Sequence, residues 1–236
     1  RDRDVTGVQT CALPISVAAV TVNGTAGGIS GSGANLTGSS YTVNGTSGGV
    51  TISANLLGSG TLTKSNAGNL TLSGSNGYTG NTTLTGGITI AGSDTAFGSG
   101  GTVVLNAGTL QASSTRTLAN PVSLNANSTI SGASAITFTG NLTDTLSGNT
   151  TLTVSSTGLT AFGNVTLASD AVASTFTLAG TGNVTVNGAI GEGAATGTSL
   201  VKSNTGTLTL SGSNSYTGNT TLTGGTVIVD SNSSFG

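Results

Sequence analysis

The chain has 236 residues, of which 40 are Gly, and its five basic and seven acidic residues give a net charge of −2. So small a charge excludes the basic footprint with which proteins bind nucleic acid or anionic membranes, and no apolar run is long enough to span a bilayer as a helix. The chain has no His, which removes the commonest general base and metal ligand. Strong helix formers are scarce, whereas Thr and Val favour extended chain and Gly and Asn favour tight turns. Composition therefore predicts an all-β protein.

The first 16 residues differ in composition from the rest. They hold two of the five basic residues and the only cysteine, Cys11. The string VTGVQTCALPI resembles the translation of a common sequencing adapter and lacks the continuous apolar stretch of a signal peptide. We expect residues 1–16 to be a non-native or disordered leader and residues 17–236 to form one repeat segment. That segment has no cysteine, which excludes a disulfide framework and a Cys-based metal site.

A short unit repeats along the chain. TVNGTAGGIS begins at Thr21 and TVNGTSGGVT at Thr42, and apolar strand centres follow at 61–63, 83–85, 103–105 and 122–124. The spacing, about 19 to 22 residues, lies in the range that indicates solenoid repeats.

Each unit contains short runs in which apolar residues alternate with Thr, such as Leu70-Thr71-Leu72. A period of two places Leu on one face of a strand and Thr on the other. A strand this short cannot bury its apolar face alone, but equivalent strands of successive units can stack. Three short strands and their turns fit in about 20 residues, which is one coil of a parallel β-helix. We predict a single-stranded parallel β-helix of about ten coils, filled by Leu, Val and Ile.

A longer duplication overlies the short one. Residues 62–98 align without gaps with residues 200–236, at a constant separation of 138 positions, and share SGSN-x-YTGNTTLTGG. We therefore expect residues 138 apart to occupy equivalent coil positions, with Leu72 and Leu210 pointing inward. The predicted structural repeat positions are Leu70, Leu72, Asn76, Tyr78, Leu84, Leu208, Leu210, Asn214, Tyr216 and Leu222.

Three details of the duplicated unit leave choices open. Tyr78 and Tyr216 form either a surface platform for a glycan or corner residues that cap the coil stack; we favour the second, with the ring buried and the hydroxyl in water. Lys64 and Lys202 are expected to be solvated edge charges. The apolar residues of 88–91 and 226–229 alternate in opposite phase, so either both faces are partly buried or a bulge re-phases one copy.

The stretch LVKSNTGTLTLSGSNSYTGNTTLTGGTVIV, residues 200–229, resembles the autotransporter-associated β-strand repeat, and the copy at 62 matches it nearly as well. The resemblance implies a right-handed parallel β-helix in the passenger region of a type V secreted autotransporter. It also implies export to the surface of a Gram-negative-type bacterium, with release or anchoring by a C-terminal membrane barrel. We expect an internal fragment with a structural or adhesive role and no catalysis. Surface glycans or proteins of a host or neighbouring cell are the expected partners, and the open coil ends are expected to self-associate.

The competing hypothesis is a polysaccharide-acting enzyme or a glycan-binding module. Asp144, Asp170 and Glu192 are 26 and 22 residues apart, near the coil period, so a β-helix could stack them on one face. Paired carboxylates on one face perform glycoside hydrolysis. The alternative is three isolated solvated acids, and no catalytic residue, cofactor or metal ligand is assigned. Dispersal of the three over different faces would exclude the enzyme.

Overall fold

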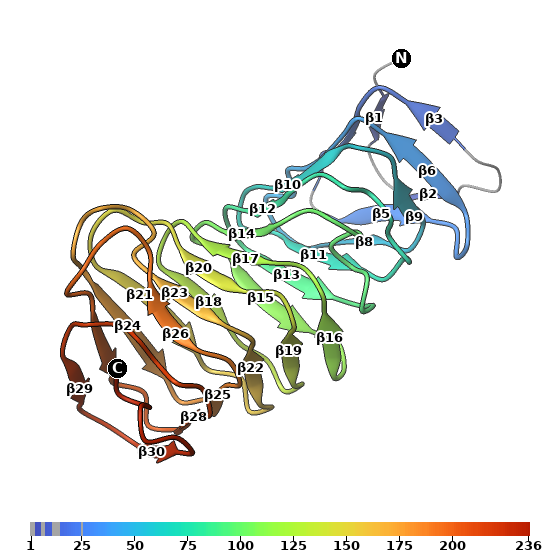
Figure 1. Cartoon of the computed structure of the whole chain (residues 1–236). Coiled ribbons are helices and arrows are strands. Elements are labelled where there is room, and N and C mark those ends of the chain that lie inside the picture. Colours follow the sequence, from blue (N-terminus) through green and yellow to red (C-terminus); the bar gives the residue numbers. More distant parts are fainter. Residues whose placement is uncertain (1–2, 6–7, 11–14, 25) are drawn as a thin grey trace.

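The computed structural model describes residues 3–5, 8–10, 15–24 and 26–236, and side chains within 15–24 and 26–236. In these ranges the chain forms thirty short β-strands and no helix. Figure 1 shows the strands stacked into an elongated rod, with β1 to β3 toward one end and β29 and β30 at the other. Every strand pair is parallel and joins one coil to the next, as between β10 and β12. The predicted β-solenoid of about ten turns is confirmed.

The first side of the solenoid is a ten-stranded sheet. Its strands, in spatial order, are β1 (Arg3–Val5), β4 (Val20–Val22), β7 (Ser40–Val43), β10 (Thr61–Lys64), β12 (Thr82–Leu84), β14 (Val103–Leu105), β17 (Val122–Leu124), β20 (Leu142–Asp144), β23 (Val165–Leu167) and β26 (Ile190–Glu192).

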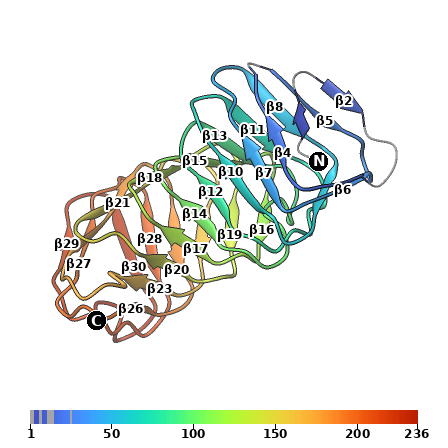
Figure 2. The same ribbon diagram turned by 90° about the horizontal axis from the view of Figure 1, so that it is seen from above.

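The second side is an eleven-stranded sheet. Its strands are β2 (Val8–Thr10), β5 (Gly27–Ser30), β8 (Gly49–Ile52), β11 (Asn69–Leu72), β13 (Ile88–Ala91), β15 (Thr109–Ala112), β18 (Ser128–Ile130), β21 (Thr150–Val154), β24 (Thr175–Gly180), β27 (Ser199–Lys202) and β29 (Thr220–Leu222). Figure 2 shows strands of the two long sheets running side by side along the rod.

The third side is interrupted. It holds a three-stranded sheet of β3 (Ile15–Val17), β6 (Asn35–Gly38) and β9 (Asn55–Leu57), and a six-stranded sheet of β16 (Arg116–Leu118), β19 (Ile136–Phe138), β22 (Thr160–Phe162), β25 (Val184–Val186), β28 (Thr207–Leu210) and β30 (Thr226–Val229). Between the two sheets, residues 73–81 and 92–102 complete their coils without a strand.

The register between strands aligns buried side chains of successive coils in columns. In the ten-stranded sheet Leu62 pairs with Thr82, Thr82 with Val103 and Val103 with Val122, and all four side chains are buried. In most three-residue strands, such as β14, the first and third residues are buried and the second is half-buried. Alternate residues of a strand face the interior, which gives this pattern. Burial is thus distributed over the interfaces between coils.

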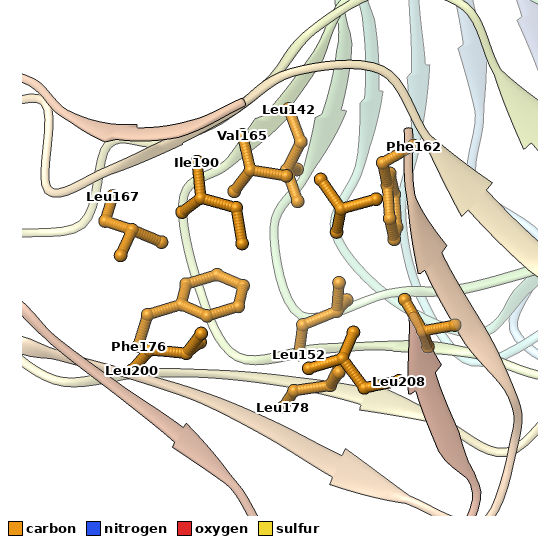
Figure 3. Close-up of a pocket in the computed structure, with 12 residues that line it drawn as sticks. Leu142, Leu152, Phe162, Val165, Leu167, Phe176, Leu178, Ile190, Leu200 and Leu208 are labelled. Atoms are coloured by element: carbon orange, nitrogen blue, oxygen red, sulfur yellow. The ribbon is translucent and has the colours of Figure 1, made fainter. Parts of the chain in front are cut away.

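The interior is filled, not hollow. Figure 3 shows apolar side chains of coils near the C-terminal end pointing toward one another around a small gap, among them Leu152, Phe162, Phe176 and Ile190. The gap measures about 20 Å³ and its lining is wholly apolar. A space near the size of one water molecule with no polar partner stays dry, so it is a packing gap and no ligand chamber.

The described parts of the N-terminal segment continue the solenoid. Strands β1 and β2 pair in parallel with β4 and β5, and β3, which spans the expected boundary at residue 16, pairs with β6. Cys11 lies outside the described residues. The non-native or disordered origin of this segment and the boundary at 17 stay predictions.

Candidate functional site

The two copies of the duplicated unit lie on different sides of the solenoid. The first copy uses β10 to β13, which belong alternately to the ten- and eleven-stranded sheets. The second copy uses β27 to β30, which belong alternately to the eleven- and six-stranded sheets. The prediction that residues 138 apart occupy equivalent coil positions is therefore wrong at the level of the sheets. All three sides are built of short parallel strands, so the same unit can begin on any of them.

Within each copy the local register is the same. Leu70 pairs with Thr89 in the first copy, and Leu208 pairs with Val227 in the second. Thr89 and Ala91 are buried while Ile88 and Ile90 are half-buried on the outer face. Val227, the counterpart of Thr89, packs against the core. No bulge re-phases either copy: the first copy places its two Ile on the partly buried outer face, which is the first of the two predicted alternatives.

Each copy contains a strand-free arc, residues 73–81 and 211–219, in which a buried Asn binds the neighbouring coils. Asn76 Oδ1 accepts a hydrogen bond from the backbone N of Leu56 at 2.8 Å, and its Nδ2 donates to the carbonyl of Ala96 at 2.7 Å. Leu56 lies one coil before the arc and Ala96 one coil after it. Asn214 makes the same two contacts, to Ile190 N at 2.6 Å and Ser234 O at 2.5 Å. One side chain thus joins three successive coils in an arc without strands, in addition to backbone hydrogen bonds between coils such as Gly77 N to Leu56 O at 2.8 Å.

The two tyrosines of the unit are buried with their hydroxyl groups. Tyr78 Oη lies 2.5 Å from Thr82 Oγ1, and Tyr216 Oη lies 2.6 Å from Thr220 Oγ1. Burial raises the pKa of both phenols. Burial of both rings does not fit the alternative of a surface platform for a glycan. The favoured alternative is right for the rings, but the hydroxyl of each is buried too and shares a hydrogen bond with a Thr four residues on.

The two lysines are buried, which corrects the prediction of solvated edge charges. Lys64 and Lys202 are each 0% exposed. Lys64 Nζ donates to the carbonyls of Ser65, Asn66 and Gly86 at 2.8, 2.9 and 3.2 Å. Burial lowers the pKa of this ammonium group, and the three carbonyls oppose that effect because they accept from its charged form.

Lys202 repeats this cage. Its Nζ donates to the carbonyls of Asn204, Gly206 and Gly224 at 2.7, 2.8 and 2.9 Å, and burial lowers its pKa as well. The sequence did contain the signal: Lys64 lies two residues after the inward Leu62, so strand alternation places it inward. The turn that follows Lys64 supplies two of its three carbonyls, with Asn66 at φ 63°, and the next coil supplies the third.

The three carboxylates lie along one side of the solenoid. Asp144 ends β20 and Glu192 ends β26, two strands further on in the same sheet, while Asp170 follows the strand between them. The dispersal that would have excluded the enzyme is not observed. Among the described residues, however, no three His, Cys, Asp or Glu side chains come together as a metal site.

Each carboxylate is engaged in a turn. Asp144 is buried, and its Oδ1 accepts from the backbone N of Leu146 and from Thr150 Oγ1, both at 3.1 Å, while its Oδ2 has no partner. Burial raises the pKa of Asp144, and the charge of Asp170 adds to the effect. Asp170 Oδ1 accepts from Val172 N at 3.3 Å.

Unlike those of Asp144, both oxygens of Glu192 accept hydrogen bonds, from Thr198 N at 2.6 Å and from Thr217 Oγ1 at 2.9 Å. Glycoside hydrolysis needs an acid and a base that both face the substrate. The arrangement offers instead one buried acid and two turn-capping carboxylates. Surface grooves of about 430 and 350 Å³ lie elsewhere, one beside Asp94 and Asn120 and one beside Thr220 and Phe235.

Sequence reasoning missed a polar cluster at the first groove. Arg116 Nη1 lies 3.8 Å from Asp94 Oδ1, and its Nη2 donates to Gly92 O at 2.6 Å. Asp94 Oδ1 also accepts from the backbone N of Thr117 at 3.2 Å. Through its bond to Thr117, Asp94 pairs a backbone amide of β16, the first strand of the six-stranded sheet. The coil before β16 has no strand on this side. The sequence contained a signal for this pair: Arg116 is the single Arg of residues 17–236 and follows Asp94 by about one coil period.

The described residues contain no helix with the length and apolarity to cross a membrane. Comparison with known families matches residues 62–91 and 200–229 to the passenger-associated-transport-repeat. No curated protein and no solved structure matches the chain. Both matched segments coincide with the strand pairs, the caged lysine and the Asn-x-Tyr arc described above. Residues 62–91 and 200–229 are therefore two passenger-associated-transport-repeats within one parallel β-solenoid.

Proposed function

We propose that this chain is a structural or adhesive rod segment of a surface-exposed autotransporter passenger and performs no catalysis. One observation carries the proposal: the distinctive residues of the repeat are buried and bind neighbouring coils. Lys64, Asn76 and Tyr78 each contact backbone or side chains of the solenoid and leave no reactive group exposed. Residues used in this way build length and stiffness.

The outer surface suits a role outside the cell. In the ten-stranded sheet, the outward position of successive coils is Thr21, Thr42, Thr63 and Thr83, paired in register. Such a surface offers hydroxyl groups and almost no charge. Glycans or proteins of a host or neighbouring cell are the partners that we propose for it, because neutral hydroxyl and amide groups bind polar ligands by hydrogen bonds alone.

A polysaccharide-acting enzyme is the second candidate, favoured by one observation, the alignment of Asp144, Asp170 and Glu192 along one side. The test is a hydrolysis assay of the purified chain on a panel of bacterial and host polysaccharides, with Glu192→Gln as the matched variant. We expect no product from either protein. Release of reducing ends by the wild type but not by Glu192→Gln would overturn the proposal.

The location is tested separately. Antibodies raised against the purified chain should label intact cells that produce the full protein as strongly as permeabilised cells. Labelling only after permeabilisation would contradict a surface location. The adhesive role predicts retention of the purified chain on a glycan array or on cells, and a rod that binds none of them would be structural only.

A further inference from the structure

The corner between the ten- and eleven-stranded sheets is wider in three successive coils than in the coil before them. Residues 125–127 form the short turn between β17 and β18, whereas the next three connections at this corner run from β20 to β21, from β23 to β24 and from β26 to β27 and are longer. We name residues 144–150, 168–174 and 192–198 the wide corner. Each of its three segments contains one of the three carboxylates that lie along this side of the solenoid.

Buried oxygen atoms without a hydrogen-bond partner gather at the wide corner. Among the described side chains, six buried polar atoms have no partner, and three of the six are Asp144 Oδ2, Ser174 Oγ and Thr198 Oγ1. Asp144 and Thr198 are 0% exposed, and Ser174 is 8% exposed. A buried polar atom opposes folding unless something at the site satisfies it. The three oxygens therefore indicate a polar ligand inside the corner.

The three side chains belong to three successive coils. Strands β24 and β27 pair in a register that sets Ser174 beside Thr198. Asp144 lies in the coil before Ser174, and its hydrogen bond to Thr150 Oγ1 at 3.1 Å spans the corner. In the coil after Ser174, the hydrogen bond from Thr198 N to Glu192 at 2.6 Å spans it in the same way. The two sides of the corner are thus within hydrogen-bond reach of each other on both sides of Ser174.

The spacing of the coils suits a metal ion at the level of Ser174. Two coil steps span about 9.6 Å, and a bond from Ca²⁺ to an oxygen ligand measures about 2.3–2.6 Å. Two such bonds and two short side chains bridge the span. An ion at this level is therefore within reach of Asp144 from one neighbouring coil and of Thr198 from the other.

The charge at the wide corner is uncompensated. No Lys or Arg occurs in the sequence between Arg116 and Lys202. Arg116 lies beside Asp94, and the amine of Lys202 is enclosed by three carbonyls. Asp170 is near enough to Asp144 for its charge to raise the pKa of that carboxyl. A buried carboxylate is stable when it is paired or coordinates a metal, and the described side chains offer Asp144 no cationic partner.

We propose that the wide corner binds one Ca²⁺ ion through Asp144 Oδ2, Ser174 Oγ and Thr198 Oγ1, with Asp170 as the second carboxylate. Ligands that are all oxygen select a hard cation, and water and backbone carbonyls complete the six to eight oxygens that Ca²⁺ takes. Hydroxyl groups supply part of this set, because among the described residues no three carboxylates come together. Sites with so few charged ligands are weak, with a dissociation constant of about 10⁻⁴–10⁻³ M. The ion ties three coils where their turns are longest, and the inference does not depend on the proposed passenger role.

Calcium titration of the purified chain, stripped beforehand with EDTA, tests the proposal. Calorimetry should show one site per chain, and the urea midpoint should rise in millimolar calcium relative to EDTA because the ion binds the folded state. Asp144→Asn should weaken calcium binding about tenfold or more, because it removes a charged ligand. Ser174→Ala should weaken it to a smaller extent. In EDTA both variants should be at least as stable as the wild type, because each removes an unsatisfied buried group, so their loss of binding does not reflect misfolding.

The matched control is Thr89→Val. Thr89 is also 0% exposed with an unpaired hydroxyl, but it lies in β13, away from the three acids. This variant should bind calcium as the wild type does. A wild-type chain whose urea midpoint is indifferent to calcium would overturn the proposal, since buried water would then satisfy the three oxygens. Equal calcium binding by the wild type and Asp144→Asn would also overturn it, as would an equal shift with magnesium, which would indicate general screening of the acids.

Discussion

Asn76 and Leu56 lie in neighbouring coils, and the side-chain oxygen of Asn76 accepts the backbone N–H of Leu56 at 2.8 Å. The amide nitrogen of the same Asn donates to Ala96 in the coil that follows. Together with the backbone hydrogen bonds between coils, this relationship explains how the repeat can leave a strand out of one side of the solenoid. It also explains the recurrence of the arc, since Asn214 repeats both contacts.

Replacing Asn76 by Ala should destabilise the chain. The change leaves a buried N–H and a buried C=O unpaired, and each unpaired group costs about 1–3 kcal/mol. Asn69→Ala, at an exposed position of β11, should stay within about 0.5 kcal/mol of the wild type. Urea unfolding followed by circular dichroism compares the two. Similar midpoints for both variants would show that Asn76 is not a tie between coils.

Asp144 should make the chain more stable in weak acid than at neutral pH. Its pKa is raised in the folded state, so its contribution is fully present below the unfolded pKa of about 3.9 and is lost as pH rises through the folded value. Asp144→Asn keeps the acceptor for Leu146 and Thr150 and cannot ionise. This variant should unfold at a higher urea concentration than the wild type at pH 7.

The control for this prediction is Asp230→Asn, at an exposed position, which should unfold at the wild-type urea concentration at pH 7. The free energy of unfolding of each variant is measured between pH 3 and pH 8. An Asp144→Asn chain that is no more stable than the wild type at pH 7 would contradict the burial of an ionisable Asp144.

The two faces of β11 should respond differently to truncation. Leu72 is fully buried and Thr71 faces outward. Leu72→Ala should cost about 2–5 kcal/mol, and Thr71→Ala about 0.5 kcal/mol or less. Thermal or urea unfolding of the two variants measures the difference. Equal losses would show that the inward and outward faces have been assigned wrongly.

The purified chain should associate as its concentration rises, because β29 and β30 present unpaired strand edges beside Leu222 and Phe235. Light scattering should show an increasing mean mass. A constant monomer mass at all concentrations would contradict the prediction.

The sequence was sufficient for the strands and their inner faces and insufficient for their placement in sheets. Leu72 and Leu210 are buried as expected because alternation in a strand depends only on neighbouring residues. The shift of the second copy to another side could not be foreseen from a constant period. The step along the ten-stranded sheet is 20 residues from Leu62 to Thr82 but 25 from Val165 to Ile190. Because the later coils have longer turns, the strands of the second copy fall on different sides of the solenoid from those of the first.

For the lysines, the charge of the residue predicts exposure, whereas its position in the strand predicts burial. Lys64 is expected from its charge to be a solvated edge residue, although its position two residues after Leu62 points inward. What sequence could not supply is the cage: the carbonyl of Gly86 comes from the next coil. For Asp144 the register beside Leu124 decides the burial, and register follows from the loop lengths that the sequence leaves open.

Chemical labelling of lysine tests most directly the claim that the distinctive residues of the repeat are buried and bind neighbouring coils. Lys64 and Lys202 are the only lysines of the chain, and each amine is enclosed by three carbonyls. Acetylation of the folded chain, followed by peptide mass spectrometry, should leave both lysines unmodified at a reagent exposure that modifies both in the urea-unfolded chain. Acetylation of either lysine in the folded chain at the rate of the unfolded chain would contradict the account.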